Sequence, residues 1–298
     1  MKYTNKFGFP EYVVEWLKFD EYDLQKGAIS ATSLMKPPKM YVLEQMYSDD
    51  IEIEVSDLVA SRYGTAIHDS VEKVKLTNAI QEKRIATIID GAKIVGKFDI
   101  MLKTEEETYK LVDVKSTSVW TYIYGSKDED YVKQLSIYRL LGVRNGYPVE
   151  KDAEIFMVFT DWSPSKAKRE EEYPDTRVKI KKIKLWSIKE TEEWIEERLR
   201  MFRETAAAPQ KDMPDCNEEE LWGDKTTYAV MKKGRKTAVR VLNSELEADT
   251  YIERNTEFNP KDLYVEKRPA KVRRCNYCKV KEFCKQYGEL KSKGLIIE

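Results

Sequence analysis

Residues 94–115, IVGKFDIMLKTEEETYKLVDVK, constrain the fold of this chain most, because they predict two strands joined by a short acidic turn at residues 104–108. Side chains alternate between the two faces of a strand, so Asp113 and Lys115 project to the same side of the second strand. If the turn is centred near Glu106, Asp99 on the first strand lies across from Asp113. The segment therefore predicts two carboxylates and an ammonium group on one face of a hairpin.

Two acids and a lysine gathered in this way are costly to bury unless something binds them. Oxygen ligands of this kind are those that Mg²⁺ and Mn²⁺ prefer in proteins. The hairpin therefore predicts a site for a divalent metal ion. A surface hairpin whose charges point to water fits these residues alone equally well.

The chain has a single histidine, His68, in the segment RYGTAIH. Apolar spacing that extends to Val71 and Val74 predicts a helix here, in which Gly64 and His68 lie four residues apart on one face. A glycine one turn before the histidine lets the helix approach another backbone closely. His68 is thus a candidate third metal ligand, and the alternative is a polar residue without a special role.

A second helix is predicted for residues 131–141, YVKQLSIYRLL, because the acids at residues 128–130 favour a helix start. Gln134 and Tyr138 lie four residues apart and share a face. Either both side chains face the hairpin and hold the active centre or the substrate, or Tyr138 is a core residue and Gln134 a surface residue.

Four short motifs occur in order along the chain: GTAIH, GKFDI, LVDVKSTS and QLSIY. Together they resemble the PD-(D/E)XK nuclease superfamily, and more narrowly its RecB-like, CRISPR-associated-type and phage exonuclease branch. The resemblance directly covers about residues 30–141. It implies an α/β (α+β) fold with a restriction-endonuclease-like core, in which helices flank a central mixed β-sheet.

The resemblance also implies a role for each matching residue. The metal ligands implied for Mg²⁺ or Mn²⁺ are the side chains of His68, Asp99 and Asp113 and the backbone carbonyl of Val114. Lys115 would orient or polarise the attacking water, and Gln134 and Tyr138 would have a positioning role.

The chemistry fits these residue types, because hydrolysis of a phosphodiester at a carboxylate-bound metal needs no covalent enzyme intermediate. A Ser-His-Asp enzyme would need His68 as its base, and the chain has no Gly-x-Ser-x-Gly elbow. The residues therefore favour metal-dependent hydrolysis.

The four cysteines are a second signal: Cys216 stands apart, and Cys275, Cys278 and Cys284 lie within ten residues. Residues 1–10 lack an apolar signal core and no long apolar run follows, so we expect a cytoplasmic protein that does not span a membrane. Cysteines gathered in such a chain favour a metal site over disulfides. Four thiolates suit both Zn²⁺ and an iron–sulfur cluster, so the ligand count does not decide between them.

The spacing of Cys275, Cys278 and Cys284 resembles the C-terminal triplet of iron–sulfur nucleases in the same branch. This implies a 4Fe-4S cluster on the four cysteines, with Zn²⁺ as the alternative. Cys216 departs from the pattern, because in those relatives the fourth cysteine often precedes the nuclease motifs, whereas here it follows them. We therefore expect the cluster to close the segment between Cys216 and Cys275 onto the nuclease rather than to join the two chain ends.

The net charge of −1 gives no hint of a nucleic-acid partner, but its distribution does. Residues 225–285 contain 16 Lys and Arg against 8 Asp and Glu, whereas the remainder contains 36 against 45. Such a basic region can hold phosphate backbones, and the alternative is a solvated charged face.

The patterns predict three regions: a nuclease core at residues 1–208, a small basic ββαβ module at 209–270 entered through Cys216, and a Cys-rich segment at 271–298. In the module, strands are expected at residues 227–231, 237–242 and 263–267, and a helix at 245–254. Trp120, Tyr122 and Tyr124 follow the catalytic hairpin and are either core residues or stacking partners for the bases of a single strand.

Taken with the resemblance, the sequence predicts a metal-dependent DNA exonuclease, of phage or prophage origin, that processes DNA ends in recombination or replication. One alternative is a structure-selective or restriction-type endonuclease on the same fold. Another is a non-catalytic zinc-containing protein that binds nucleic acid. The expected partners are single-stranded DNA or duplex ends, and a recombinase or single-strand-binding protein.

Overall fold

The computed structural model describes residues 1–19 and 27–297, and the chain divides into two compact units. The first unit comprises Met1–Lys36 and Glu52–Glu204, and the second comprises Pro37–Ile51 and Thr205–Glu298. In the part of the chain that the structure describes, no helix is long and apolar enough to cross a membrane.

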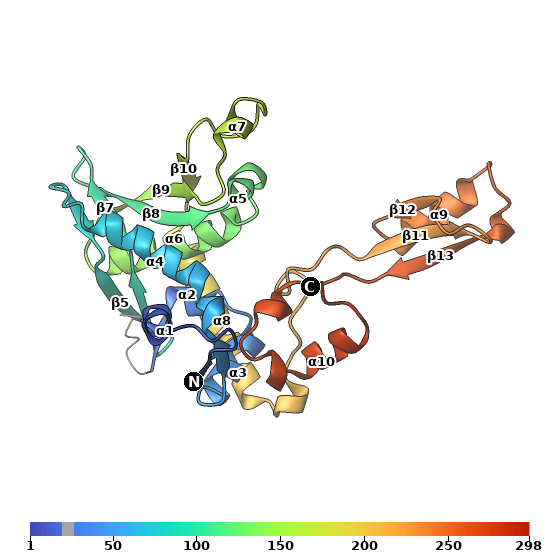
Figure 1. The fold of residues 1–298 in the computed structure, drawn as a ribbon, viewed down its shortest axis with the longest axis horizontal. Helices are drawn as coiled ribbons and strands as arrows, with labels where there is room; N and C mark the ends of the chain where they lie inside the picture. The colour runs from blue at the N-terminus through green and yellow to red at the C-terminus, as the bar shows by residue number, and fades with distance from the viewer. Residues whose placement is uncertain (20–26, 298) are drawn as a thin grey trace. The chain divides into compact units, whose positions relative to one another are not determined.

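The first unit is built on a five-stranded sheet with the strand order β10-β9-β8-β7-β4 (Figure 1). Its strands are β4 (Ala79–Gln81), β7 (Ile100–Lys103), β8 (Tyr109–Thr117), β9 (Val149–Phe159) and β10 (Val178–Lys184). β8 and β9 are parallel, because two helices form the crossover between them, and the other neighbours are antiparallel. The mixed sheet flanked by helices that the motifs implied is therefore confirmed.

Helix α4 (Val59–Glu72) covers one face of this sheet, where Ile67 and Val71 pack against Val112 and Val114 of β8. It runs across the front of the strands in Figure 1. Helix α6 (Asp128–Arg144) covers the opposite face, since Lys115 projects away from Val114 and its Nζ lies 5.9 Å from the ring centre of Tyr131 on α6. The helices predicted around His68 and Gln134 are both confirmed.

A three-stranded sheet of order β2-β6-β5 continues the first unit, with β2 (Ala28–Ser30), β5 (Arg84–Ile89) and β6 (Ala92–Lys97). A short parallel pair joins β1 (Lys2–Thr4) to β3 (Glu52–Glu54). The remaining helices that begin in this unit are α1 (Glu11–Lys18), α2 (Ala31–Leu34), α5 (Val119–Tyr124), α7 (Pro164–Ala167) and α8 (Ile188–Ala207). Ser30 is the N-cap of α2, because its hydroxyl accepts a hydrogen bond from the Ser33 backbone nitrogen.

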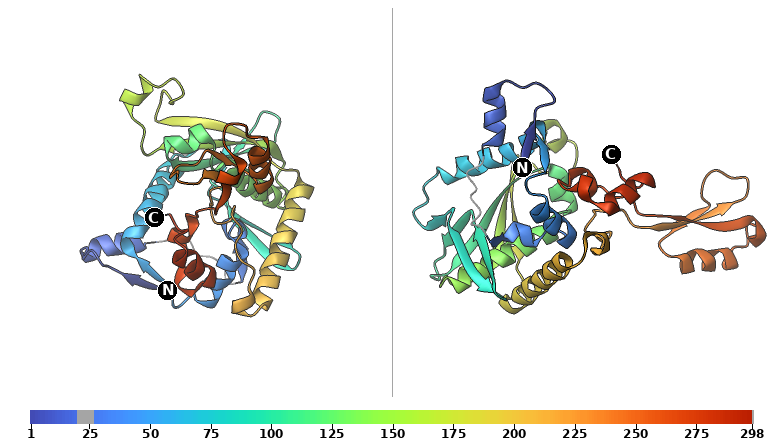
Figure 2. Two further views of the ribbon diagram at one scale, coloured as in Figure 1. Left: turned by 90° about the vertical axis from the view of Figure 1, so that its right-hand side faces the viewer. Right: turned by 90° about the horizontal axis from the view of Figure 1, so that it is seen from below.

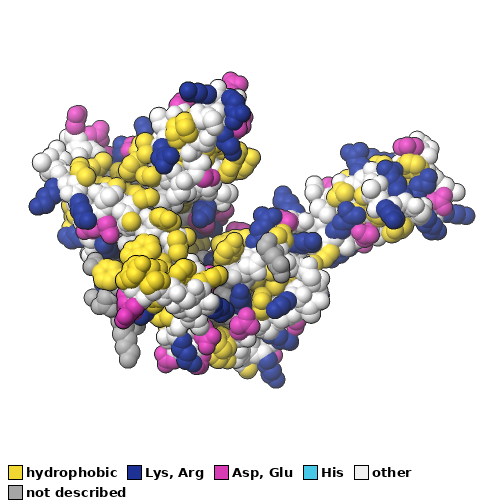
Figure 3. Space-filling model, in the orientation of Figure 1, with side chains coloured by type: hydrophobic (Ala, Val, Ile, Leu, Met, Phe, Trp, Pro, Cys, Tyr) yellow, Lys and Arg dark blue, Asp and Glu magenta, His cyan; other side chains and the backbone are white. Residues whose placement is uncertain are grey.

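The second unit contains the predicted ββαβ module, made of β11 (Thr227–Lys232), β12 (Arg240–Leu242), α9 (Glu245–Arg254) and β13 (Leu263–Arg268). The strands form an antiparallel sheet of order β12-β11-β13, and the right-hand view of Figure 2 shows α9 along one face of it. Ala248 of α9 packs there against Val230 and Leu263. Lys and Arg side chains are spread over the visible surface of the module (Figure 3).

Two further helices belong to the second unit, α3 (Pro38–Met46) and α10 (Lys285–Ser292). Two 3-10 turns, Arg274–Tyr277 and Lys281–Phe283, carry or adjoin the cysteine triplet just before α10.

Candidate metal centres

Asp99 is the centre of the first candidate site, and it lies in a bend between β6 and β7 rather than on a strand as expected. The backbone leaves the three-stranded sheet after Lys97 and enters the five-stranded sheet at Ile100. Because Asp99 is not held in a regular pleat, its Oδ2 contacts both the β8 backbone and a side chain of α4. It accepts a hydrogen bond of 2.7 Å from the Val114 backbone nitrogen and lies 3.4 Å from His68 Nδ1.

The register of the β7–β8 hairpin places Asp99 opposite Asp113, as predicted. Ile100 pairs with Val112 and Lys103 with Tyr109, so the turn is centred at Glu106. Continuing this register by one residue beyond Ile100 and Val112 places Asp99 opposite Asp113. The prediction holds because a hairpin's turn fixes the register of all its pairs.

A second hairpin brings in Glu82, an acid that the sequence analysis missed. β4 pairs with β7 and β5 with β6 in one continuous register, broken only where the chain changes sheets. At that break Glu82 faces Asp99, and its backbone nitrogen donates to the Asp99 carbonyl at 2.8 Å. Asp90 and Gly91, both with positive φ, form the tight turn of this hairpin. That dipeptide is a strong hairpin signal and predicts the pairing of Glu82 with Asp99.

Three acids, Glu82, Asp99 and Asp113, therefore lie opposite one another in one row, with Asp113 on β8 and the other two in the breaks between strands. Like charges placed opposite one another in a sheet are destabilising unless a cation offsets them. Lys97 forms an ion pair with Glu82, and Lys115 lies 2.8 Å from Asp113 Oδ2. Burial nevertheless raises the pKa of the Glu82 carboxyl.

Asp113 is the most buried of these acids, with 2% of its surface exposed. Burial raises the pKa of its carboxyl to about 6, against the opposing effect of Lys115. Lys115 is the one cation at this oxygen among the described residues, with its Nζ 2.8 Å from Asp113 Oδ2. A carboxylate oxygen has more than one lone pair, so a bound metal ion could share it with Lys115.

His68 is positioned by α4 so that its imidazole meets Asp99. The hydrogen bond with Asp99 raises the pKa of His68, and the negative charges of Asp99 and Asp113 act in the same direction. In α4, a Cβ at Gly64 would lie 3.5 Å from Ser116 Oγ of β8, an ordinary contact distance. Gly64 therefore permits the approach of α4 to β8 but is not strictly required by it.

The donor set fits a hard divalent cation. One ligand atom each from His68, Glu82 and Asp99 lies within 4.8 Å of the others, and Asp113 lies outside that closest group. The two carboxylates suit Mg²⁺ or Mn²⁺, and the imidazole would add a nitrogen donor. The structure thus brings His68 and Asp99 together and adds Glu82.

A cavity of about 530 Å³ opens beside this group within the first unit. His68 and Glu82 line it together with two further acids, Asp69 and Glu72. The cavity is also lined by three cations, Arg62, Arg84 and Lys97. Two aromatic side chains, Trp16 and Phe19, line it as well. Cations next to a metal-binding group can hold phosphate oxygens.

Gln134 and Tyr138 lie together on α6, where Gln134 Nε2 donates to the Tyr138 hydroxyl at 3.1 Å. Tyr138 is 6% exposed, and its ring packs on Gly96 of β6, where a Cβ would stand only 2.8 Å from the ring carbons. The glycine of the GKFDI segment thus makes room for the tyrosine of the QLSIY segment. This contact lies three residues before Asp99.

The second candidate site is formed by the four cysteines, all within the second unit. They line one small cavity of about 30 Å³ together with residues of α3 such as Met40 and Leu43. Burial, with smaller contributions from neighbouring cysteines, raises the pKa of Cys216 to about 12 and that of Cys275 to about 11. A bound cation would favour the ionised form of thiols gathered in this way.

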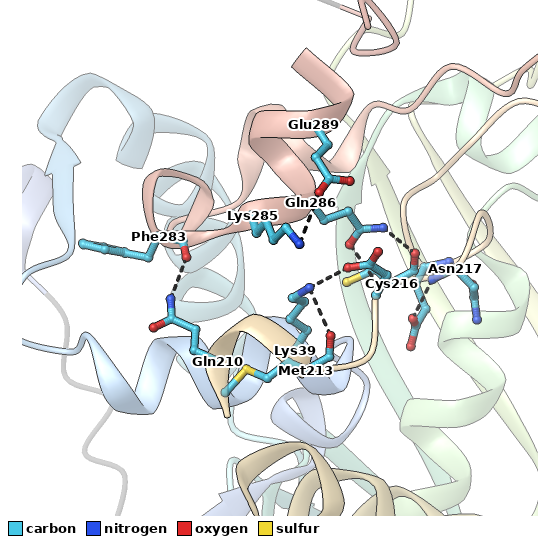
Figure 4. Close-up of polar contacts among 11 residues, drawn as sticks. Lys39, Gln210, Met213, Cys216, Asn217, Phe283, Lys285, Gln286 and Glu289 are labelled. Atoms are coloured by element: carbon cyan, nitrogen blue, oxygen red, sulfur yellow. Dashed lines mark hydrogen bonds and ion pairs between the residues drawn. The ribbon is translucent and has the colours of Figure 1, made fainter. Parts of the chain in front are cut away.

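Cys216 is far from the triplet in sequence, and Gln286 of α10 holds it there. Gln286 accepts a hydrogen bond of 3.0 Å from the Cys216 nitrogen and donates one of 2.8 Å to the Cys216 carbonyl (Figure 4). Beside it, the buried Lys39 of α3 contacts Asp215 Oδ1 at 2.6 Å. The loop before Cys216 is therefore fixed at both its backbone and its side chains.

A further support comes from Tyr47, whose ring stacks on Phe283 with 4.1 Å between the centres. Gln210 links the two residues, since it accepts from the Tyr47 hydroxyl at 2.7 Å and donates to the Phe283 carbonyl at 3.0 Å. Phe283 immediately precedes Cys284, so these contacts position the end of the triplet.

Comparison with known proteins adds three solved structures. No protein-family model and no curated protein matches the chain. The structure of SSO0001 is similar with a TM-score of 0.46 and 16% identity, covering 64% of this chain and 85% of that one. An alkaline exonuclease from Laribacter hongkongensis is similar with a TM-score of 0.36 and 12% identity, covering 60% of this chain and 89% of that one. The complex of that exonuclease with dAMP is similar with a TM-score of 0.38 and 14% identity, covering 65% of this chain and 92% of that one. With TM-scores below 0.5, these similarities do not carry the functional argument, which rests on the geometry of the site.

Proposed function

We propose that this protein is a metal-dependent deoxyribonuclease that hydrolyses phosphodiester bonds, with exonuclease action on DNA ends. The observation that carries the proposal is the row of Glu82, Asp99 and Asp113 with His68 and Lys115, of which His68 and Glu82 line a cavity that also has cationic walls. A structural role alone would not require three acids in register, one of them fully buried.

His68, Asp99 and Asp113, the Val114 carbonyl and Glu82 would hold Mg²⁺ or Mn²⁺. When bound, such an ion lowers the pKa of a water and offsets phosphate charge. Lys115 would orient the attacking water, because its ammonium is fixed by Asp113 and by the face of Tyr131. Tyr131 was not predicted as part of the site.

Arg62, Arg84 and Lys97 would hold the phosphates that flank the scissile bond. Gln134 and Tyr138 act indirectly, because Tyr138 supports β6 just before the Asp99 bend. We therefore assign these two residues a positioning role.

We further propose a 4Fe-4S cluster on Cys216, Cys275, Cys278 and Cys284. The sequence spacing of Cys275, Cys278 and Cys284, which resembles that of iron–sulfur nucleases, favours a cluster over Zn²⁺. Anaerobic purification followed by iron, sulfide and zinc analysis tests this, and colourless protein with stoichiometric zinc would exclude the cluster.

The biological setting follows from the resemblance of the motifs, which favours processing of phage or prophage DNA ends beside a recombinase or single-strand-binding protein. Exonuclease and endonuclease action are separated by linear and covalently closed circular DNA. Cutting of closed circles would indicate an endonuclease on this fold.

The decisive experiment uses end-labelled DNA with Mn²⁺ or Mg²⁺ and compares Asp113→Ala with Glu107→Gln. Glu107 lies in the exposed turn of the same hairpin, so its change should leave the rate intact. Asp113→Ala should lower the rate on the order of 100-fold or more. If the wild type degrades no substrate, or if Asp113→Ala changes nothing, the catalytic proposal is wrong and a binding protein is favoured.

A further inference from the structure

Helix α5 carries a pair of aromatic rings that present exposed surface to solvent. Trp120 and Tyr124 lie one helical turn apart, with ring planes 16° from parallel and centres 5.9 Å apart. They are 38% and 74% exposed. The packing of α5 is instead provided by Val119, which is fully buried, and by Tyr122, whose ring contacts Phe159.

The pair is held rigidly. The Asp161 carboxylate accepts hydrogen bonds from the Ser118 hydroxyl at 2.6 Å and the Val119 nitrogen at 2.8 Å, which anchors the start of α5. Tyr173, 3% exposed, packs edge-on against Trp120, and its hydroxyl donates to the Asp161 carbonyl. The start of α5 and the Trp120 ring are therefore positioned in advance of any binding.

A cation adjoins the rings. Lys166 Nζ lies 5.0 Å from the centre of the Trp120 ring and 5.9 Å from that of Tyr173. Residues 170–172 of the same loop are acidic, so charge alone does not define this surface. Its distinguishing feature is the combination of exposed aromatic faces with one ammonium group.

The surface directly follows the catalytic strand. β8 carries Asp113 and Lys115 and ends at Thr117, and α5 begins at Val119. Trp120 is five positions after Lys115, so their Cα atoms are at most about 18 Å apart. A strand bound at the metal centre would reach the rings within a few nucleotides.

We propose that Trp120, Tyr124 and Lys166 form a stacking platform for unpaired bases of the DNA strand bound at the active centre. Bases inside a duplex are stacked on neighbours at both faces, so exposed rings stack most readily on the unpaired bases of a single strand. Lys166 pairs with the accompanying phosphate. This inference rests on the proposed nuclease function and narrows its substrate to single strands or unpaired ends.

Binding is measured without hydrolysis in full-length protein carrying Asp113→Asn, by anisotropy of a labelled single strand and of a matched duplex. Trp120→Ala and Tyr124→Ala should each weaken single-strand binding about tenfold, with much less change for the duplex. Trp120→Phe should restore most of the affinity. Tyr12→Ala is the matched control, because Tyr12 is 77% exposed on α1 and does not line the cavity.

Lys166→Ala gives an independent readout, since loss of one phosphate contact should lower the slope of log affinity against log salt by about 0.7. Unchanged single-strand affinity in folded Tyr124→Ala would overturn the platform, even if the wild type cuts DNA. If the wild type cuts no DNA but the Trp120→Ala and Tyr124→Ala variants still lose single-strand affinity, the platform is supported and the proposed hydrolysis is refuted. Equal losses of affinity for the single strand and the duplex would overturn the platform.

Discussion

Replacing Gly96 by alanine should destabilise the protein, because the position has no room for a methyl group. A Cβ there would stand 2.8 Å from Tyr138 Cδ1 and Cε1 and 2.9 Å from Leu141 Cδ1. Tyr138 and Leu141 are 6% and 0% exposed, so neither has space to withdraw. β6 is also paired on both sides, with β2 and β5, so the strand cannot move outward freely.

The expected loss follows from two opposing effects. Overpacking of a filled core costs about 1–3 kcal/mol. The lower chain entropy of alanine in the unfolded state returns about 0.4–1 kcal/mol. We therefore expect Gly96→Ala to lower the free energy of unfolding of the first unit by about 1–2 kcal/mol.

Urea denaturation followed by tryptophan fluorescence measures this change as a lower midpoint. Gly64→Ala is the matched control, because its Cβ would meet Ser116 Oγ at an ordinary 3.5 Å. In a helix interior this change should be neutral or stabilising by up to about 1 kcal/mol. Gly96→Ala as stable as the wild type would refute the reasoning, whereas partial recovery in combination with Tyr138→Leu would identify the clashing partner.

Three further predictions concern the metal sites. Glu82→Gln should weaken Mn²⁺ binding about tenfold in calorimetric titration, and unchanged affinity would remove Glu82 from the ligand set. Cys278→Ala should lower the melting temperature and the bound metal content more than the rate per folded molecule, because a structural metal contributes to folding free energy; an equally stable, fully loaded variant would contradict this. Gln286→Ala should lower the free energy of unfolding by about 1–3 kcal/mol, because two hydrogen bonds to the Cys216 backbone are lost. Thermal unfolding of the metal-free protein measures this change.

The sequence by itself determined the row of acids. The turn at Glu106 fixes the register of β7 and β8, so Asp99 and Asp113 face each other whatever surrounds them. The turn at Asp90 and Gly91 likewise fixes the register of β5 and β6, and this register places Glu82 opposite Asp99. The ββαβ module was predictable for a similar reason, because its periodicity and turns are local.

The tertiary structure decided what local patterns do not contain. It alone determined that Asp99 leaves the strand, because the bend arises where the chain passes between two sheets. It also brought His68 to Asp99, Tyr138 to Gly96, and Cys216 to the triplet through Gln286. Such contacts depend on how helices pack on sheets and on which space remains free, so they follow from the shapes of distant segments rather than from spacing along the chain.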